Sequence, residues 1–119
     1  MSLKPLIAIV EDDDSLRPAL VGLVRSMGYD GEGYGSAEAF LEEDAGTRAN
    51  CVVSDFQLPG IDGLDLAGLL RKIVPVIIVT ARTERTIDER ATANGVLCLL
   101  RKPFEADDLA GCIRRALDS

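Results

Sequence analysis

The chain has 119 residues, 47% of them hydrophobic, which is enough for one domain with one core and too little for a second. We therefore expect residues 1–119 to form a single domain. Thirteen basic and twenty acidic residues give a net charge of −7, which argues against direct nucleic-acid or membrane binding by this domain. The first apolar run is too short for a secretion signal or a membrane span, which indicates a soluble, cytoplasmic protein.

The cysteine and histidine content limits which covalent links, metal sites and catalytic groups the chain can have. The three cysteines have no CxxC spacing and lie in apolar runs or on an apolar stripe, so we expect small buried side chains rather than disulfides or a zinc site. The chain contains no histidine. This excludes histidine-based acid–base catalysis and a phosphohistidine of the protein's own.

Strand-like and helical segments alternate along the chain. The strand-like runs are residues 6–10, 30–35, 51–54, 75–79 and 96–100. Helical periodicity begins near Asp14 or Ser15 and ends before Gly28, returns at 36–41, and recurs at 85–94 and 109–117. The apolar stripe of the third helix is predicted to comprise Leu66, Leu69, Leu70 and Ile73. The pattern predicts a doubly wound α/β fold with a five-stranded, mostly parallel sheet and helices on both faces.

The segment 85–94 differs from the other predicted helices. Ile87 and Ala91 are nearly its only apolar anchors among charged and threonine residues. We expect it to be the least stably packed helix.

Residues capable of chemistry follow directly after the strand-like runs. Glu11 and Asp12 follow the first, Asp55 follows the third, Thr80 closes the fourth and Lys102 comes just after the fifth. In a parallel sheet these positions share one edge, where open α/β sheets bind ligands. Three carboxylates, a hydroxyl and a lysine predict a site for a hard divalent cation and a phosphoryl group.

Four short motifs in this order carry a family resemblance. They are Ile9-Val10-Glu11-Asp12-Asp13, the stretch from Asp55 to Gly63 (DFQLPGIDG), Thr80-Ala81 and Lys102-Pro103-Phe104. With them, the chain resembles the receiver domain of a two-component response regulator from about Leu6 to Leu117. The resemblance implies a flavodoxin-like fold of the receiver type.

The resemblance also implies roles for the residues at this edge. Asp55 would accept a phosphoryl group, and a carboxylate bonded to phosphorus makes a labile mixed anhydride suited to a transient signal. Mg²⁺ would be held by Glu11, Asp12, Asp55 and the main-chain carbonyl of Gln57. Thr80 and Lys102 would contact the phosphoryl oxygens, although a threonine that ends a strand and a lysine at a loop tip are each often only structural.

Neighbouring residues are given other roles. Asp13 and Asp14 are expected in a solvated turn or helix cap rather than as ligands. The Lys102-Pro103 bond is typically cis in the family. Gln57 and Arg82 hold the positions that tune the lifetime of the phosphate, with a solvated loop residue as the equal alternative for Arg82. Leu99 stands where the family often has the aromatic ring of its switch. We therefore expect signalling mainly through movement of residues 85–94 and the adjoining last strand.

The function implied is a phosphorylation-activated switch. Its partner would be a sensor histidine kinase or a histidine phosphotransfer protein, with a homodimer also conceivable, and any output domain would lie outside residues 1–119. A dehalogenase-like phosphatase would need an aspartate where Gln57 stands. A degenerate receiver that signals by protein contacts alone is the remaining alternative, and the intact set of site residues disfavours it.

Overall fold

The computed structural model describes residues 3–43 and 48–118, and in these residues strands and helices alternate along the chain. The strands are β1 (Leu6–Val10), β2 (Asp30–Tyr34), β3 (Cys51–Asp55), β4 (Val76–Thr80) and β5 (Cys98–Arg101). The helices are α1 (Leu16–Ser26), α2 (Ala37–Glu42), α3 (Gly63–Leu70), α4 (Arg85–Ala93) and α5 (Ala106–Asp118).

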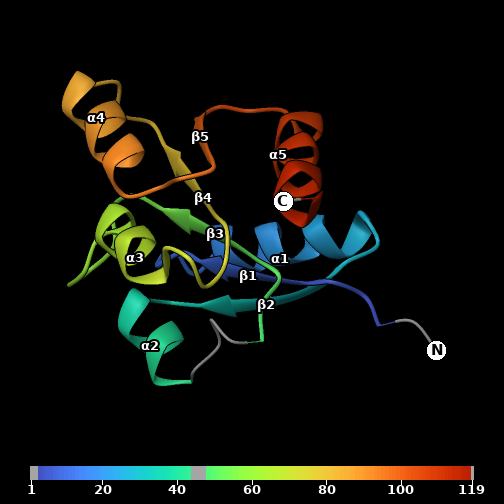
Figure 1. Cartoon of the computed structure of the whole chain (residues 1–119). Helices are drawn as coiled ribbons and strands as arrows, with labels where there is room; N and C mark the ends of the chain where they lie inside the picture. The colour runs from blue at the N-terminus through green and yellow to red at the C-terminus, as the bar shows by residue number, and fades with distance from the viewer. Residues whose placement is uncertain (1–2, 44–47, 119) are drawn as a thin grey trace.

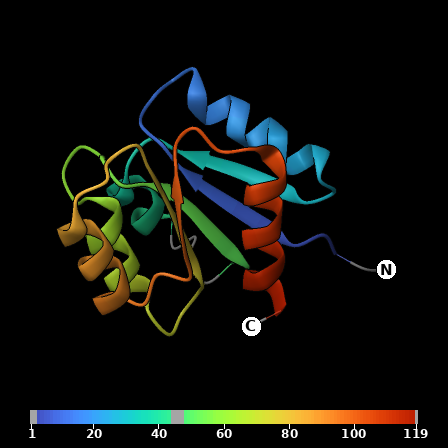
Figure 2. The ribbon, with the colours of Figure 1, turned by 90° about the horizontal axis from the view of Figure 1, so that it is seen from above.

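The strands of the described residues form one five-stranded parallel sheet in the order β2-β1-β3-β4-β5. Helices α1 and α5 cover one face, and α2, α3 and α4 cover the other (Figures 1 and 2). This confirms the predicted doubly wound fold. The strand order reverses between β1 and β3, and a ligand crevice in such sheets forms at the carboxyl ends of the strands at this point.

Two apolar cores lie on the two faces of the sheet. On β1, Ile7 and Ile9 belong to the core under α1 and α5, whereas Ala8 and Val10 belong to the core under α2, α3 and α4. A strand buried on both faces needs apolar side chains at every position, which explains the unbroken apolar runs in the sequence. The strand ends are therefore held rigidly, and the residues that follow them have defined positions.

Two of the four residues predicted for the buried stripe of α3 are exposed in the structure. Leu66 and Leu70 are buried, but Leu69 is 55% and Ile73 59% exposed. The helix ends at Leu70, so Ile73 lies beyond it, and Leu69 falls outside the face that the helix turns to the sheet. Leu64 and Ala67 complete that face instead.

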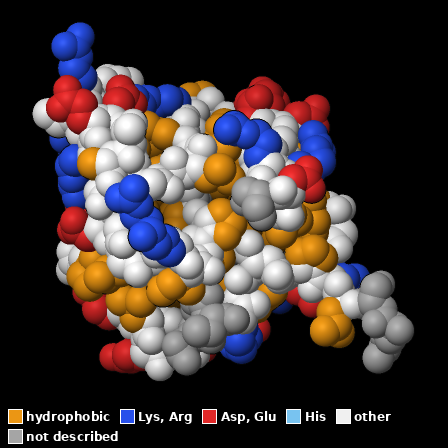
Figure 3. All heavy atoms as spheres, viewed as in Figure 1, with side chains coloured by type: hydrophobic (Ala, Val, Ile, Leu, Met, Phe, Trp, Pro, Cys, Tyr) orange, Lys and Arg blue, Asp and Glu red, His pale blue; other side chains and the backbone are white. Residues whose placement is uncertain are grey.

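Helix α4 is anchored as its sequence predicts. Ile87 and Ala91 are its buried residues. Side chains of both charge signs cover the region of α4 at the upper left of Figure 3. Little apolar surface therefore holds this helix to the sheet.

The cysteines are free and buried, as expected. Burial raises the pKa of the Cys51 and Cys112 thiols to about 12, so these two are inert at neutral pH. Among residues 3–43 and 48–118, no helix has both the length and the apolar character that a membrane crossing requires.

Candidate functional site

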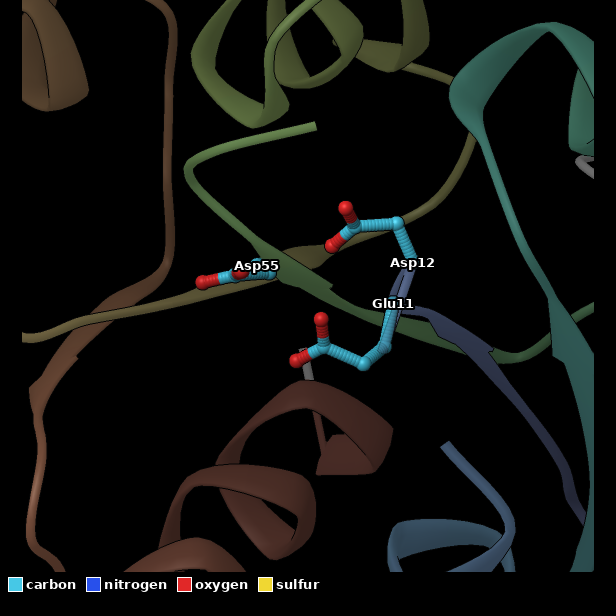
Figure 4. A group of neighbouring side chains, drawn as sticks. All are labelled: Glu11, Asp12 and Asp55. Carbon is cyan, nitrogen blue, oxygen red and sulfur yellow. The ribbon is translucent and has the colours of Figure 1, made fainter. Parts of the chain in front are cut away.

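Three carboxylates meet at the carboxyl ends of β1 and β3. These strands are neighbours with Val10 paired to Ser54, so the residues that follow, Glu11 and Asp55, come side by side, with Asp12 next to them. One carboxylate oxygen from each of the three lies within 4.8 Å of the others (Figure 4). The sequence prediction that these acids converge is confirmed.

Lys102 joins this cluster from the loop after β5. Its Nζ lies 3.5 Å from Asp55 Oδ1 and 3.8 Å from Glu11 Oε1. The backbone fixes the residue, since the Lys102 N–H donates to the carbonyl of Thr80 at 2.8 Å. The Lys102-Pro103 peptide bond is cis, as the resemblance implies. The site thus combines three acids with one cation.

The acid cluster carries uncompensated negative charge. Glu11 is only 3% exposed, and burial raises its pKa to about 7, with the nearby Asp55 adding to the rise. The Asp13 amide, which donates to the Glu11 carboxylate, and Lys102 oppose this shift. Burial also raises the pKa of Asp55 against the effect of Lys102. One lysine does not balance three acids, and clustered carboxylate oxygens are the donor set of a hard divalent cation.

Asp13 and Asp14 serve the adjoining turn, as expected. Asp13 Oδ1 accepts from the Ser15 N–H at 2.8 Å and the Leu16 N–H at 2.9 Å, and so caps α1. Asp14 pairs with Arg17, whose Nη1 also donates to the Glu11 carbonyl at 2.9 Å. This role of Arg17 had no signal in the sequence.

Thr80 and Arg82 lie at the end of β4, next to β3. Thr80 is 2% exposed, and its Oγ1 accepts from the Arg82 N–H at 3.0 Å. The Arg82 guanidinium donates three hydrogen bonds to the Glu84 carboxylate and lies 5.7 Å from the centroid of the Phe56 ring. Arg82 is therefore a partnered side chain next to the site.

Gln57 and Leu99 lie outside the group of three carboxylates. Gln57 is exposed at the start of the loop after β3, two residues past Asp55. Leu99 is partly buried on β5 and packs against the core under α2, α3 and α4.

The loop between β3 and α3 (residues 56–62, the β3–α3 loop) is closed at its base. The Gly63 N–H donates to the Phe56 carbonyl at 2.9 Å. A Cβ at Gly63 would overlap the carbonyl oxygen of Asp55, so only glycine permits this approach. Asp62 caps α3 by accepting from the Asp65 N–H at 2.8 Å. The backbone after Asp55 is thereby confined.

Two charged side chains reach this loop from neighbouring helices. Glu38 of α2 accepts from the Ile61 N–H at 3.0 Å, and Arg90 of α4 contacts the Asp62 carboxylate at 3.0 Å. Sequence reasoning missed both. Glu38 lies in a Ser-Ala-Glu stretch that signals only a helix start, and the Arg90 contact depends on how α3 and α4 pack.

The sequence model of the response regulator receiver domain family matches residues 7–114 of the chain. The chain belongs to this family. Receiver domains are signalling modules of two-component response regulators, and they interact with histidine kinases. The fold and the order of the site residues agree with that membership.

Relatives of this receiver domain are response regulators. It is 33% identical to the response regulator protein TmoT of Ectopseudomonas mendocina, with 94% of this chain and 52% of the relative covered. It is 32% identical to the transcriptional regulatory protein FixJ of Bradyrhizobium diazoefficiens, over 98% and 58% of the two chains. The solved structure of the response regulator StyR has a TM-score of 0.86 at 34% identity, covering 97% of this chain and 60% of that one. The chain spans about half the length of the curated relatives it matches.

Proposed function

We propose that this receiver domain accepts a phosphoryl group on Asp55 from a partner's phosphohistidine, with Mg²⁺, and switches conformation in response. The observation that carries the proposal is the meeting of Glu11, Asp12 and Asp55 within 4.8 Å, with Lys102 Nζ 3.5 Å from Asp55. An Asp55 oxygen would bond to phosphorus while the phosphorus–nitrogen bond breaks and its electron pair returns to the imidazole.

Glu11, Asp12, Asp55 and the Gln57 carbonyl would hold the Mg²⁺ ion. The donor set fits, because three carboxylate oxygens already lie close together and need a cation for balance. When bound, Mg²⁺ draws negative charge from the phosphoryl oxygens. Lys102 supplies a fixed positive charge beside Asp55, and the Thr80 hydroxyl can donate a hydrogen bond to the phosphorylated side chain.

The phosphoryl group would come from a histidine outside residues 1–119, since these residues contain none. An apolar hollow next to the site is lined by Leu16, Leu20, Val79, Lys102, Pro103 and Phe104. Lys102 borders both this hollow and the acid cluster. A helix of a sensor kinase or phosphotransfer protein seated there would present its histidine to Asp55.

The response would pass mainly through α4. This helix has few buried apolar residues, so a change in its position costs little free energy. Leu99 offers no aromatic ring that could swing inward. Phosphorylation would bias an existing equilibrium between arrangements of α4 and β5. A receiver that signals by contacts alone has no observation in its favour.

Intact-mass measurement with a small acyl-phosphate donor and Mg²⁺ tests the proposal. The wild type should gain one phosphoryl mass, and Asp55→Asn should gain none. Asp14→Asn is a matched control, because Asp14 is exposed and pairs with Arg17 rather than with the cluster. Equal yields of phosphorylated protein from the wild type and Asp55→Asn would contradict the assignment of Asp55 as the acceptor.

A further inference from the structure

The β3–α3 loop is fixed at its ends, but its tip needs support of its own. The base is closed by the bond between the Gly63 N–H and the Phe56 carbonyl. Gly60 at the tip has φ +74°, a conformation that glycine adopts without strain. Gln57, whose carbonyl is the proposed Mg²⁺ ligand, lies between base and tip. Its position therefore depends on what holds the tip in place.

Glu38 of α2 supports the tip directly. Its Oε2 accepts the Ile61 N–H at 3.0 Å, and a Cβ at Gly60 would overlap its carboxylate. The carboxylate thus fills the space beside the turn and satisfies an amide that would otherwise need water. This bond lowers the pKa of Glu38, so the acceptor is charged at neutral pH.

Helix α2 presents Glu38 from a firm base. Phe40 is fully buried and its ring makes an edge-on contact with Tyr34 at 5.3 Å between centroids. The Ser36 side chain caps the helix by accepting from the Ala39 N–H at 3.0 Å. Glu38 lies outside the acid cluster, so its contact with the loop needs a separate explanation.

We propose that Glu38 is a positioning residue that holds the β3–α3 loop in the shape in which the Gln57 carbonyl can bind Mg²⁺. The inference rests on the proposed function and adds a residue to its site. Without Glu38 the tip of the loop loses one hydrogen bond. In the variant, binding of the ion must then order a loop that in the wild type is ordered before the ion binds, and this ordering weakens the affinity. The expected result is weaker Mg²⁺ binding with little change in the chemistry once Mg²⁺ is bound.

Three variants of the whole chain separate this role from a general effect on folding. Glu38→Ala removes the acceptor, Glu38→Gln keeps an oxygen that can accept from Ile61, and Glu42→Ala changes an exposed acid on the same helix. By isothermal titration with Mg²⁺ alone, Glu38→Ala should raise the Kd about five-fold, equivalent to about one net hydrogen bond. Glu38→Gln should recover most of the affinity, and Glu42→Ala should match the wild type.

Kinetics with an acyl-phosphate donor give a second measurement. In Glu38→Ala the Mg²⁺ concentration for half-maximal phosphorylation should rise about five-fold, while the rate at saturating Mg²⁺ stays within about two-fold. All assays are run well below the lowest Tm of the set.

Several outcomes would overturn the positioning role. A lower Tm in Glu38→Ala with an unchanged Mg²⁺ Kd would show that Glu38 only stabilises the fold. Equal losses in Glu38→Gln and Glu38→Ala, or a wild type that binds no Mg²⁺, would also reject it. A wild type that binds Mg²⁺ more tightly than Glu38→Ala but takes no phosphoryl group would leave the positioning role standing and reject the proposed function alone.

Discussion

Helices α5 and α4 cover opposite faces of the same sheet, and they are held there by different forces. Helix α5 buries Leu109, Cys112, Ile113 and Ala116 in its core. Helix α4 buries only Ile87 and Ala91, and arginines supply further links. These links are Arg90 to Asp62 and Asp65, Arg101 to Asp88, and the Arg71 guanidinium to the Ala93 carbonyl.

The difference supports the proposal that α4, rather than α5, responds to a change at the site. Burial of apolar side chains is the main force that holds α5. Exposed ion pairs contribute about 0.5 kcal/mol each and weaken with salt, so the links of α4 are easily exchanged. The Arg90 link ends on the β3–α3 loop, directly after the proposed acceptor. A change there can thus reach α4 without disturbing α5.

The sharpest contrast should come from truncating one isoleucine in each helix. Ile113→Ala in α5 should lower the free energy of unfolding by about 4 kcal/mol, because the side chain is fully buried in a well-packed core. Ile87→Ala in α4 should cost about 2 kcal/mol, because a loosely anchored helix can settle into the space. Urea unfolding followed by circular dichroism measures both. An equal or larger loss in Ile87→Ala would contradict the comparison.

The free energy of unfolding should depend on pH through Glu11, whose side chain extends toward α5 (Figure 4). The folded pKa of about 7 exceeds the ordinary 4.5, so the folded state retains this proton over that interval. Without Mg²⁺, this contribution to stability is full below about pH 4.5 and is lost as pH rises through about 7, by about 3 kcal/mol in total.

Thermal unfolding across this pH range checks the sign. Glu11→Gln should flatten the decline, leaving a smaller slope from Asp55, whose pKa is also raised. Saturating Mg²⁺ should reduce the decline in the wild type, because the ion replaces the proton as the balancing charge. Stability that rises with pH in the absence of Mg²⁺ would contradict the raised pKa.

A smaller effect is expected from removing the link between α4 and the loop. Arg90→Gln should cost about 1 kcal/mol or less and should increase amide hydrogen exchange in both α4 and the β3–α3 loop. Asp88→Asn is the matched control, since it breaks the Arg101 link between α4 and β5 without touching that loop. If both variants change amide hydrogen exchange in the β3–α3 loop equally, Arg90 is not a specific link between α4 and that loop.

The smallest effect concerns Arg82. If its guanidinium turns from Glu84 to shield a phosphoryl group, Arg82→Ala should shorten the half-life of the phosphorylated protein a few-fold, less than about 1 kcal/mol in barrier. Glu84→Ala, which removes the carboxylate that holds Arg82, should lengthen it. Decay followed by intact mass gives both values. An unchanged half-life in Arg82→Ala would assign Arg82 to the loop structure only.

The sequence predicts the features of the structure that are determined within a single strand or helix. Glu11, Asp12, Asp55 and Lys102 each follow a strand-like run, and a parallel sheet then brings them together. Where the outcome depends on the end of a helix, as for Ile73, a periodic pattern extends too far. The contacts of Glu38 and Arg90 depend on distances between separate helices, which no local pattern encodes.

The pairing of β1 with β3 has a consequence for how the protein folds. The acids that converge on the proposed ion come from both strands, which are distant in the chain and adjacent in the sheet. The unfolded chain therefore has no preformed site, and Mg²⁺ can stabilise only states in which this pair has formed. If the pair forms after the rate-limiting step, Mg²⁺ will slow unfolding and leave the folding rate unchanged. The ion would then report, in a simple kinetic experiment, when the centre of the sheet assembles.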